Sequence, residues 1–411
     1  MTPAVVGRRL SRDTVLLIAG QAVRASGYGF TAVLLGALLA ARGYGPLQAG
    51  LVLTALIAGT ALSSLLVGAL ADRLGRRRCY AVFFLGIAGA GALVATGAPL
   101  WLLLVVALTG TLSTDVVDNG PATTLEQAML AADDAGTSRV YGTYNAVGAA
   151  AGALGALAAA LPGLAGAVSA WWFAVLVPVG LTGAVLAWRL SPAVEAGTGP
   201  VTLARAVGAH SRLGPSRGVV RRMAALFAVD AGGGGLVTTG FLAYFLTQRY
   251  GASVTALGWL FFTVSVVTAL SMVLAPRLAR RFGLVATMVG THLPSNVLLA
   301  AVAFAPTFPV AAVLLLARTT LSQMDVPTRQ ALVMSVVTAE ERTMAAAVTN
   351  AARYTVRPIG PLVAGAVQQI ALGAPLLVAG VVKAGYDLAL WRWAHRRGLD
   401  RRPVTGAGTP R

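Results

Sequence analysis

Long apolar runs alternate with short polar connections along almost the whole chain. A transmembrane α-helix needs about 20 mostly apolar residues, and each of these runs reaches roughly that length. Twelve runs fit, and we number them as spans one to twelve: 14–41, 46–70, 79–97, 100–130, 139–161, 167–190, 222–248, 253–276, 284–305, 308–337, 343–371 and 374–394. The pattern therefore predicts an all-α integral membrane protein with twelve transmembrane helices.

Composition supports a membrane protein and excludes several other classes. Of the 411 residues, 57% are hydrophobic and 11% are charged, whereas a soluble chain carries about 25% charged residues. The apolar runs are continuous rather than alternating, which argues against a β-barrel. The single cysteine, Cys79, excludes an intrachain disulfide, and the three histidines are scattered. We therefore expect neither a metal site nor a cofactor.

The net charge is +18, and the positions of the basic residues along the chain indicate the membrane topology. Most arginines fall at the two chain ends and in every second connection, as the positive-inside rule requires of cytoplasmic segments. This distribution predicts an even number of crossings and both termini in the cytoplasm. It favours contact with an anionic inner leaflet over nucleic-acid binding. The apolar run of span one continues past Arg24 to Ala41, so we interpret it as an uncleaved span. The excess of arginine over lysine, with abundant alanine and glycine, indicates a GC-rich bacterial genome, so the membrane expected is a bacterial plasma membrane.

A polar stretch at 191–221 divides the spans into two sets of six. We expect an N-terminal six-helix bundle at 1–190, a cytoplasmic linker at 191–221, a C-terminal six-helix bundle at 222–394 and a basic cytoplasmic tail at 395–411. The two sets repeat, because residues 71–77 align with 275–281 at an offset of 204. The fold class expected is therefore two pseudo-symmetric six-helix bundles.

The connection between spans two and three carries a specific motif, and it resembles the G-x-x-x-D-[RK]-x-G-[RK]-[RK] loop of the major facilitator superfamily. Every fixed position of that pattern is present: Gly68, Asp72, Arg73, Gly75, Arg76 and Arg77. The resemblance implies a transporter fold in which this loop acts as a cytoplasmic latch. It implies that Gly68 lets span two approach span eleven, that Asp72 faces the start of span eleven, and that the arginines bind acidic partners and lipid phosphates. The resemblance also implies a central cavity lined by spans one, four, seven and ten.

Charged side chains lie within the predicted spans. Placing one at the centre of a membrane helix costs about 2.5 kcal/mol or more unless the side chain faces a partner or water. The candidate cavity and coupling residues are Arg24, Asp115, Asp118, Asp230, Arg318, Asp325, Arg329, Arg353 and Arg357. At 100° per residue, Arg318, Asp325 and Arg329 share one stripe, and Asp115 shares another with Glu126. The alternative is that they form structural ion pairs, such as Arg24 with Asp115 or Asp118, or Arg318 with Asp230. Lys383 and Asp387, one turn apart, are expected to pair with each other.

Helix breakers next to these charges predict gates or kinks at Pro121, Gly233, Gly234 and Pro327. Asp118 and Asp325 adjoin the two prolines, so we favour them as the carboxylates that exchange an arginine partner for a proton. Glycines at 148, 152 and 155 in span five loosely resemble a glycine-rich motif of superfamily exporters. They favour export, although close helix packing explains them equally well.

These observations predict a secondary active transporter that works by alternating access and is coupled to protons. Export of a small amphipathic or drug-like compound is favoured, and a permease for an organic anion is the close alternative. A non-transporting sensor or assembly protein on the same scaffold is a third interpretation. We expect no enzyme, because the chain has no nucleotide-binding G-x-x-x-x-G-K-[ST] sequence and no hydrolase motif. We expect a monomer.

Overall fold

The computed structural model describes residues 10–114, 120–132, 138–166, 168–196, 213–338 and 341–398. Its described residues form helices and no strands. The helices of the first half are α1 (Arg12–Ala41), α2 (Pro46–Leu74), α3 (Arg76–Ala95), α4 (Leu100–Leu108), α5 (Pro121–Ala132), α6 (Ser138–Ala158), α7 (Leu161–Leu164), η1 (Ala170–Val175), α8 (Leu176–Trp188) and η2 (Pro192–Ala196). Those of the second half are α10 (Arg217–Gly235), α11 (Thr239–Tyr250), α12 (Val254–Phe282), α13 (Leu284–Val302), α14 (Phe308–Ser322), α15 (Asp325–Ser335), α16 (Arg342–Val356), α17 (Ile359–Gln368) and α18 (Ala374–Arg396).

The twelve-span interpretation agrees with these helices. Nine stretches of the described residues are long and apolar enough to cross a membrane. The other three predicted spans appear as pairs of shorter helices, namely α4 with α5, α14 with α15, and α16 with α17. Span seven is also interrupted, between α10 and α11. Hydropathy thus located the spans but not their breaks.

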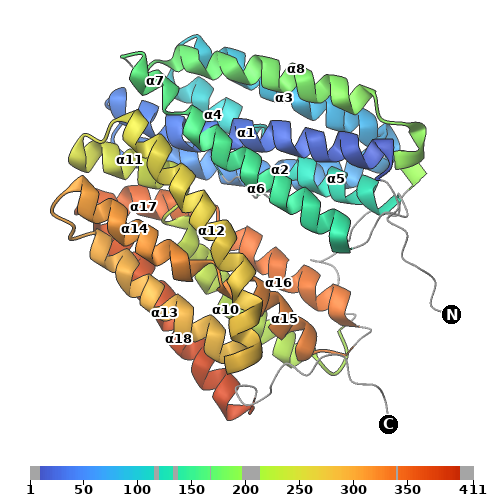
Figure 1. The fold of residues 1–411 in the computed structure, drawn as a ribbon, viewed down its shortest axis with the longest axis vertical. Coiled ribbons are helices and arrows are strands. Elements are labelled where there is room, and N and C mark those ends of the chain that lie inside the picture. The colour runs from blue at the N-terminus through green and yellow to red at the C-terminus, as the bar shows by residue number, and fades with distance from the viewer. Residues whose placement is uncertain are drawn as a thin grey trace.

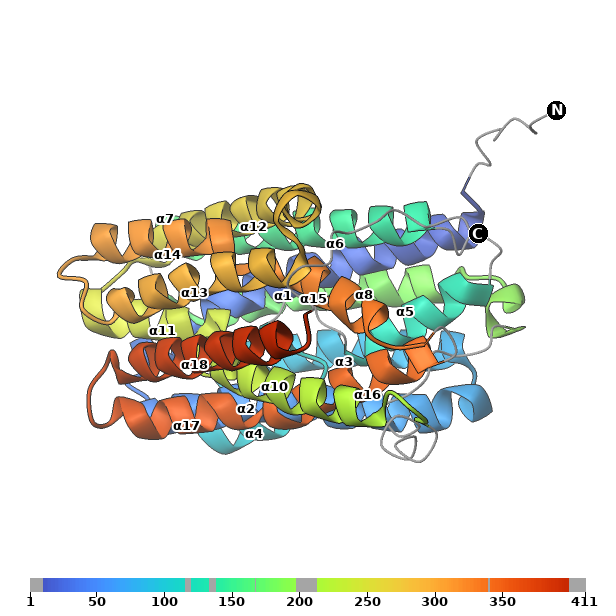
Figure 2. The ribbon, with the colours of Figure 1, turned by 90° about the horizontal axis from the view of Figure 1, so that it is seen from below.

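The two halves lie side by side and meet at one end only (Figure 1). Helices α1 to α8 form one group and α10 to α18 the other, and Figure 2 shows all long helices running roughly along one direction. The start of α1 and the turn from α2 to α3 lie at the same end of the helices, because Asp13 accepts a hydrogen bond from the N–H of Ser191 and Glu195 accepts one from the N–H of Arg76. We name this end, which also carries the 68–78 connection, the motif side, and the opposite end the far side.

Glycines bring the halves together on the far side. A Cβ placed on Gly50 of α2 would lie 2.6 Å from the carbonyl oxygen of Pro361 in α17. In the same way Gly36 of α1 abuts Gly240 of α11, and Gly258 of α12 abuts Ala160 at the end of α6. The Tyr244 hydroxyl adds a hydrogen bond of 2.8 Å to the carbonyl oxygen of Tyr44. Such contacts, at small residues, let two helix backbones approach closely.

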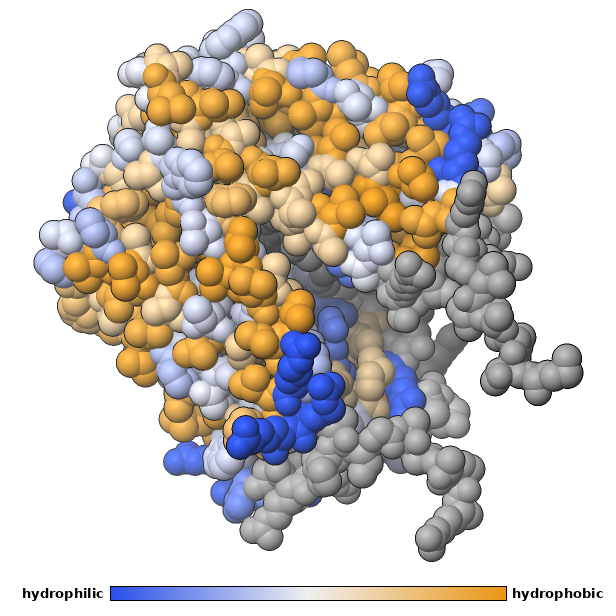
Figure 3. Space-filling view, in the orientation of Figure 1, coloured by the Kyte–Doolittle hydropathy of each residue, from blue (hydrophilic) through white to orange (hydrophobic). Residues whose placement is uncertain are grey.

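Toward the motif side the halves diverge. Figure 3 shows a hollow between them, with both apolar and hydrophilic residues around its mouth. The described parts of the two halves are therefore in contact on the far side and apart on the motif side.

The glycines of span five serve packing. Gly148 lies against Gln21, Gly152 against Gly29 and Gly155 against the backbone of Ser26, all on α1. A side chain at Gly148 or Gly155 would meet α1, and one at Gly29 of α1 would meet Gly152. Close approach of α6 to α1 therefore accounts for the pattern without reference to the direction of transport.

Replacing Gly50 by leucine should force the far side apart, because the added side chain has no room against α17. Leu53, one turn away on α2, is 1% exposed, so it reports on this contact. In a Cys79→Ala background, a Leu53→Cys thiol should react with a membrane-impermeant maleimide several-fold faster when Gly50→Leu is present. Gly142→Leu, which meets nothing within 4 Å, is the matched control. Equal labelling rates in both variants would contradict this account of the interface.

Candidate functional site

A buried ion pair lies inside the first bundle. Arg24, midway along α1, is 1% exposed, and its Nη2 lies 2.9 Å from Oε2 of Glu126 on α5. The same guanidinium donates to Thr123 at 3.0 Å and to Gln21, and it lies over the ring of Tyr28. Burial of a charge in the membrane requires this kind of compensation.

The Glu126 carboxylate accepts hydrogen bonds from side chains on three helices, α1, α3 and α6. Tyr80 of α3 donates to its Oε1 at 2.6 Å, and Tyr144 of α6 donates to its Oε2. Glu126 itself is 0% exposed. The cluster therefore ties α1, α3, α5 and α6 together and has no free face in this conformation.

The sequence analysis did not pair Arg24 with Glu126. Among the described residues, the carboxylate partner of Arg24 is Glu126 on α5, which begins at Pro121. Asp115 and Asp118, the partners considered from the sequence, lie outside the described residues, so their pairing with Arg24 stays a prediction.

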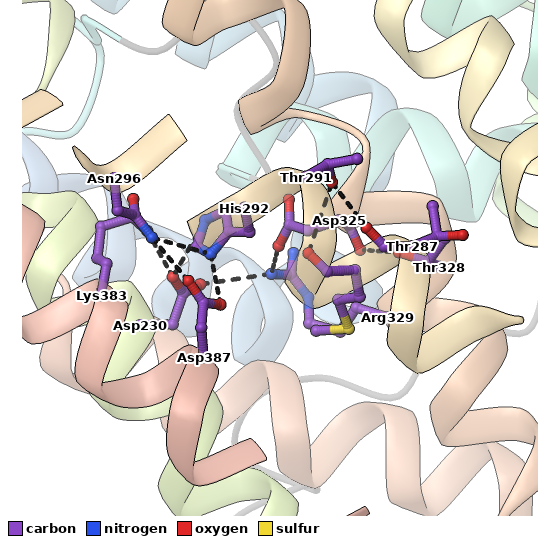
Figure 4. A network of polar contacts seen from close by, with 11 residues as sticks. Asp230, Thr287, Thr291, His292, Asn296, Asp325, Thr328, Arg329, Lys383 and Asp387 are labelled. Atoms are coloured by element: carbon purple, nitrogen blue, oxygen red, sulfur yellow. Dashed lines mark hydrogen bonds and ion pairs between the residues drawn. The ribbon is translucent and has the colours of Figure 1, made fainter. Parts of the chain in front are cut away.

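A second, larger polar cluster lies inside the other bundle (Figure 4). Asp230 of α10 receives Lys383 of α18 at 2.5 Å, and Arg329 of α15 approaches it at 3.4 Å. Arg329 also binds Asp325 at 2.7 Å, one turn earlier on α15. Two carboxylates thus share one guanidinium, and all four side chains are less than 9% exposed. The structure thus brings together Asp230, Asp325 and Arg329, three of the candidate cavity residues.

His292 and Asn296 of α13 extend the cluster, and sequence analysis did not identify them. His292 Nδ1 lies 2.8 Å from Oδ1 of Asp387, and Asn296 donates to its Oδ2 at 2.9 Å. The other ring nitrogen of His292 is 3.8 Å from Asp230. The signal that could have found them is their spacing of four residues inside an apolar span.

The expected pairing of Lys383 with Asp387 is wrong. Lys383 bonds to Asp230, whereas Asp387 is held by His292 and Asn296. Neighbouring helices supply better-placed partners than the next turn of α18. Gly233 and Gly234 make room for this arrangement, since the Lys383 side chain runs directly over them.

Arg318 of α14 and Arg353 of α16 lie beside this cluster without joining it. Both lie close enough to Asp230 and Asp325 to be attracted by their negative charges. The Nε atom of each arginine is nevertheless buried and has no hydrogen-bond partner among the described residues. Neither side chain makes an ion pair with a described residue, so the expected pair of Arg318 with Asp230 is replaced by that of Arg329 with Asp230. Both arginines are half-buried. They are cations within a span that retain some accessible surface.

The cluster and the two arginines beside it therefore hold more cations than carboxylates among the described residues. The cations are Arg318, Arg329, Arg353 and Lys383, and the carboxylates are Asp230, Asp325 and Asp387. Without counting His292, the described cations outnumber the described carboxylates by one. Arg357, the remaining arginine of this stripe, is half-buried at the end of α16 and makes an interaction of its own.

The motif residues surround the turn from α2 to α3. Gly75, with φ of 90°, ends α2 and begins α3, and the backbone N–H groups of Arg76 and Arg77 donate to the Glu195 carboxylate at 2.7 and 3.1 Å. Arg73 is exposed and Arg76 is buried. Asp72 lies in α2, but its side chain is outside the described set. A carboxylate at a helix N-terminus is stabilising, so Glu195 fixes the start of α3.

Gly68 is half-buried on α2. In this conformation α2 packs on span eleven near Gly50 and Gly365 on the far side. The latch at Gly68 and Asp72 therefore stays a prediction for another conformation.

The predicted breakers sit at helix boundaries. Pro121 is the first residue of α5, and Pro327 lies in the first turn of α15, where the missing N–H costs little. Gly233 and Gly234 fall in the last turn of α10, and the next residue, Gly235, abuts Gly360 at the break of span eleven. The breaks of spans seven and eleven therefore touch each other.

Replacing Glu126 by glutamine should destabilise the first bundle strongly. It removes the counter-charge of Arg24 inside the membrane, and breaking a buried ion pair costs about 3–5 kcal/mol. Thermal unfolding of the purified protein in detergent measures the loss. Tyr144→Phe, which removes one hydrogen bond to the same carboxylate, should cost less, and Arg24→Gln combined with Glu126→Gln should recover part of the stability. The pairing is refuted if Glu126→Gln is no more harmful than Tyr144→Phe.

Double-mutant cycles should assign the partner of Lys383. The cycle of Asp230→Asn with Lys383→Met is expected to give a coupling free energy of about 1–3 kcal/mol, as for side chains in direct contact. The cycle of Lys383→Met with Asp387→Asn should give a smaller value. Unfolding free energies in detergent provide both. A larger coupling to Asp387 would restore the pairing expected from the sequence.

Comparison with known proteins identifies the family to which this architecture belongs. Residues 17–361 match the Major Facilitator Superfamily. An uncharacterized membrane protein of Saccharomyces cerevisiae is 28% identical over 148 residues, which are 36% of this chain and 33% of the yeast protein. The chain thus spans about a third of that relative.

Solved structures with low sequence identity to this chain share its fold over almost the whole length. The nucleoside transporter NupG superposes with a TM-score of 0.74 at 16% identity, covering 94% of this chain and 99% of its own. The human organic anion transporter MFSD10 superposes with a TM-score of 0.63 at 20% identity, covering 93% and 100%. With the family match extending over most of its length, the chain belongs to the Major Facilitator Superfamily and is a multi-pass membrane transporter rather than an enzyme.

Proposed function

We propose that this protein is a proton-coupled secondary active transporter that carries a small organic anion by alternating access. The observation that carries the proposal is the surplus of cations in the second bundle, where Arg318 and Arg353 lie beside the cluster without ion-pair partners among the described residues. An anionic substrate would supply the missing negative charge. A cationic compound would be repelled there.

The orientation follows from the arginines. Arg73, Arg76, Arg77 and Arg78 all lie at the motif side, which the positive-inside rule assigns to the cytoplasm of a bacterial plasma membrane. The hollow between the two halves (Figure 3) then opens inward, and the glycine contacts near Gly50 close the outside. Both termini are cytoplasmic in this assignment.

Asp325 is the proposed coupling carboxylate in the second bundle. It shares Arg329 with Asp230, so a proton on Asp325 would leave Arg329 to Asp230 alone. Such an exchange of partners couples protonation to the positions of α10 and α15, provided that the two conformations bind the proton differently. Asp118 keeps the corresponding role predicted for the first bundle.

The net positive cluster favours the organic anion over the amphipathic, drug-like cargo also predicted from the sequence. The glycines of α6 are explained by packing against Gly29 and Ser26. Export therefore stays a prediction without support from those glycines.

Transport in proteoliposomes with an imposed pH gradient tests the proposal. A panel of small anions, neutral compounds and cations should show gradient-driven flux for anions. Arg318→Gln and Arg353→Gln should each lower that flux at least tenfold, whereas Arg342→Gln, at an exposed position outside the cluster, should not. Asp325→Asn and Asp118→Asn should abolish the response to the gradient while exchange of substrate for substrate persists.

Two outcomes would overturn parts of the proposal. Gradient-driven flux that both aspartate variants retain unchanged would remove the coupling role. Preference for cations, with flux insensitive to Arg318→Gln and Arg353→Gln, would remove the anion. A sensor or assembly protein on this scaffold would transport nothing in the panel and would tolerate Asp72→Asn.

A further inference from the structure

The chain has a single lysine, Lys383, among its 32 lysine and arginine residues, and this lysine is buried in the second bundle. Lysine carries a compact charge on a flexible stem, whereas the planar guanidinium of arginine fits two acceptors at once. The stem of Lys383 runs over Gly233 of α10, which has no side chain to fix it. This position therefore suits a cation that changes partners.

Lys383 lies between two carboxylates (Figure 4). In the structure it binds Asp230 of α10 at 2.5 Å. Asp387 lies one turn further along α18, and side chains four residues apart on a helix have Cβ atoms about 5–6 Å apart. Asp230 has a second cation, Arg329, at 3.4 Å. Asp230 would therefore keep a counter-charge if Lys383 moved to Asp387.

Asp387 makes no ion pair with a lysine or arginine in the part of the chain that the structure describes, although it is 0% exposed. Its oxygens are bound by His292 at 2.8 Å and by the side-chain amide of Asn296 at 2.9 Å. A buried carboxylate that is ionised and has no counter-charge is strongly destabilised. The pair of Asp387 and His292 is therefore most stable here when it holds two protons and has no net charge.

The second ring nitrogen of His292 favours the same number of protons. One proton lies between Nδ1 and Asp387, because a nitrogen and an oxygen at 2.8 Å share one as a hydrogen bond. Nε2 lies 3.8 Å from Oδ1 of Asp230. A proton on Nε2 makes this contact attractive, whereas a lone pair there would face a carboxylate. The geometry thus favours a proton on Nε2 in this conformation.

The charged groups around the His292 ring come from other helices, since α13 carries no other charged residue. α12, which packs on α13, has charged residues only at its motif-side end, from Arg277 onward. The described titratable and charged groups on the remaining neighbours are Lys383, Tyr386 and Asp387 of α18, Asp230 of α10, Asp325 and Arg329 of α15, and Arg318 of α14. Of these, Asp387 alone lies within hydrogen-bond distance of the ring, and Asp230 is next at 3.8 Å. A change of charge on His292 therefore acts first on these two carboxylates.

We propose that the pair of His292 and Asp387 is a proton site that controls the partner of Lys383. When Nε2 gives its proton to water, the Nε2–H bond breaks and the pair acquires one negative charge. Lys383 then moves from Asp230 to Asp387. The lysine therefore links α18 to α10 only while the proton is bound.

This exchange reaches the rest of the second cluster through one arginine. Once Lys383 has left, Asp230 depends on Arg329, which also binds Asp325 of α15. The ion pair of Lys383 with Asp387, which the structure does not form, belongs to the second protonation state. The proton site is separate from Arg318 and Arg353 and does not depend on the transported compound.

The single lysine permits a direct test, because nitrogen-15 lysine gives one side-chain signal in the full-length protein. Solid-state NMR in lipid bilayers without substrate measures its chemical shift at about pH 5 and pH 8, the range over which histidine changes charge. Asp387→Asn removes the alternative partner, and His292→Gln cannot take the second proton. The two variants should give two different Nζ shifts, neither of which changes with pH.

The native signal should match that of Asp387→Asn at the lower pH and that of His292→Gln at the higher pH. His395→Gln, an exposed histidine of the same helix, is the matched control and should behave like the native chain. Identical Nζ shifts in Asp387→Asn and His292→Gln, or a native signal that stays at one position, would overturn the proposal.

A second measurement avoids substitutions in the measured protein. Nitrogen-15 histidine labels the His292 ring, whose signals are identified by their loss in His292→Gln. Nε2 should be protonated at the lower pH and unprotonated at the higher pH, and an unchanged ring would contradict the proposal. Neither measurement uses a transported compound, so a failure to transport anions would leave this result unaffected.

Discussion

The need to compensate ionised side chains inside the membrane organises both bundles. In the first bundle one guanidinium and one carboxylate meet, and two tyrosines complete the shell of Glu126. In the second bundle the described residues bring four cations together with three carboxylates. A charge left over inside a membrane is costly unless it faces water or a partner, and this surplus is the basis of the proposed anionic substrate. The cluster around Glu126 thus holds its helices together, whereas the cluster around Asp230 is the one proposed to bind substrate.

Breaks in the helices accompany this distribution of charge. Spans four, seven, ten and eleven are each divided, and α5 and α15 begin with Pro121 and Asp325. Broken backbone within a membrane is tolerated where protein or water satisfies the freed groups. The breaks of spans seven and eleven meet at Gly235 and Gly360, next to the groups that bind Lys383. Backbone interruption and charge therefore occupy the same level of the second bundle.

Hydropathy and the positive charges were sufficient to predict the spans, because both depend on residues that are close in sequence. The partners of buried charges were harder to predict. Asp325 and Arg329, predicted to share one helical stripe, do form an ion pair, but the pair expected one turn apart, Lys383 with Asp387, does not form. That failure has a physical cause, since α10 and α13 bring Asp230 and His292 closer to those side chains than spacing along α18 can reveal. Tyr80 and Tyr144 gave no sequence signal, because buried tyrosines are common in any apolar span.

Glu195 has a mechanical consequence for the first bundle. Its carboxylate accepts hydrogen bonds from the first N–H groups of α3, and η2, in which it lies, follows α8 directly in the chain. The carboxylate therefore fastens the end of α8 to the turn at Gly75. The ends of α2, α3 and α8 at the motif side thus depend on a single negative charge.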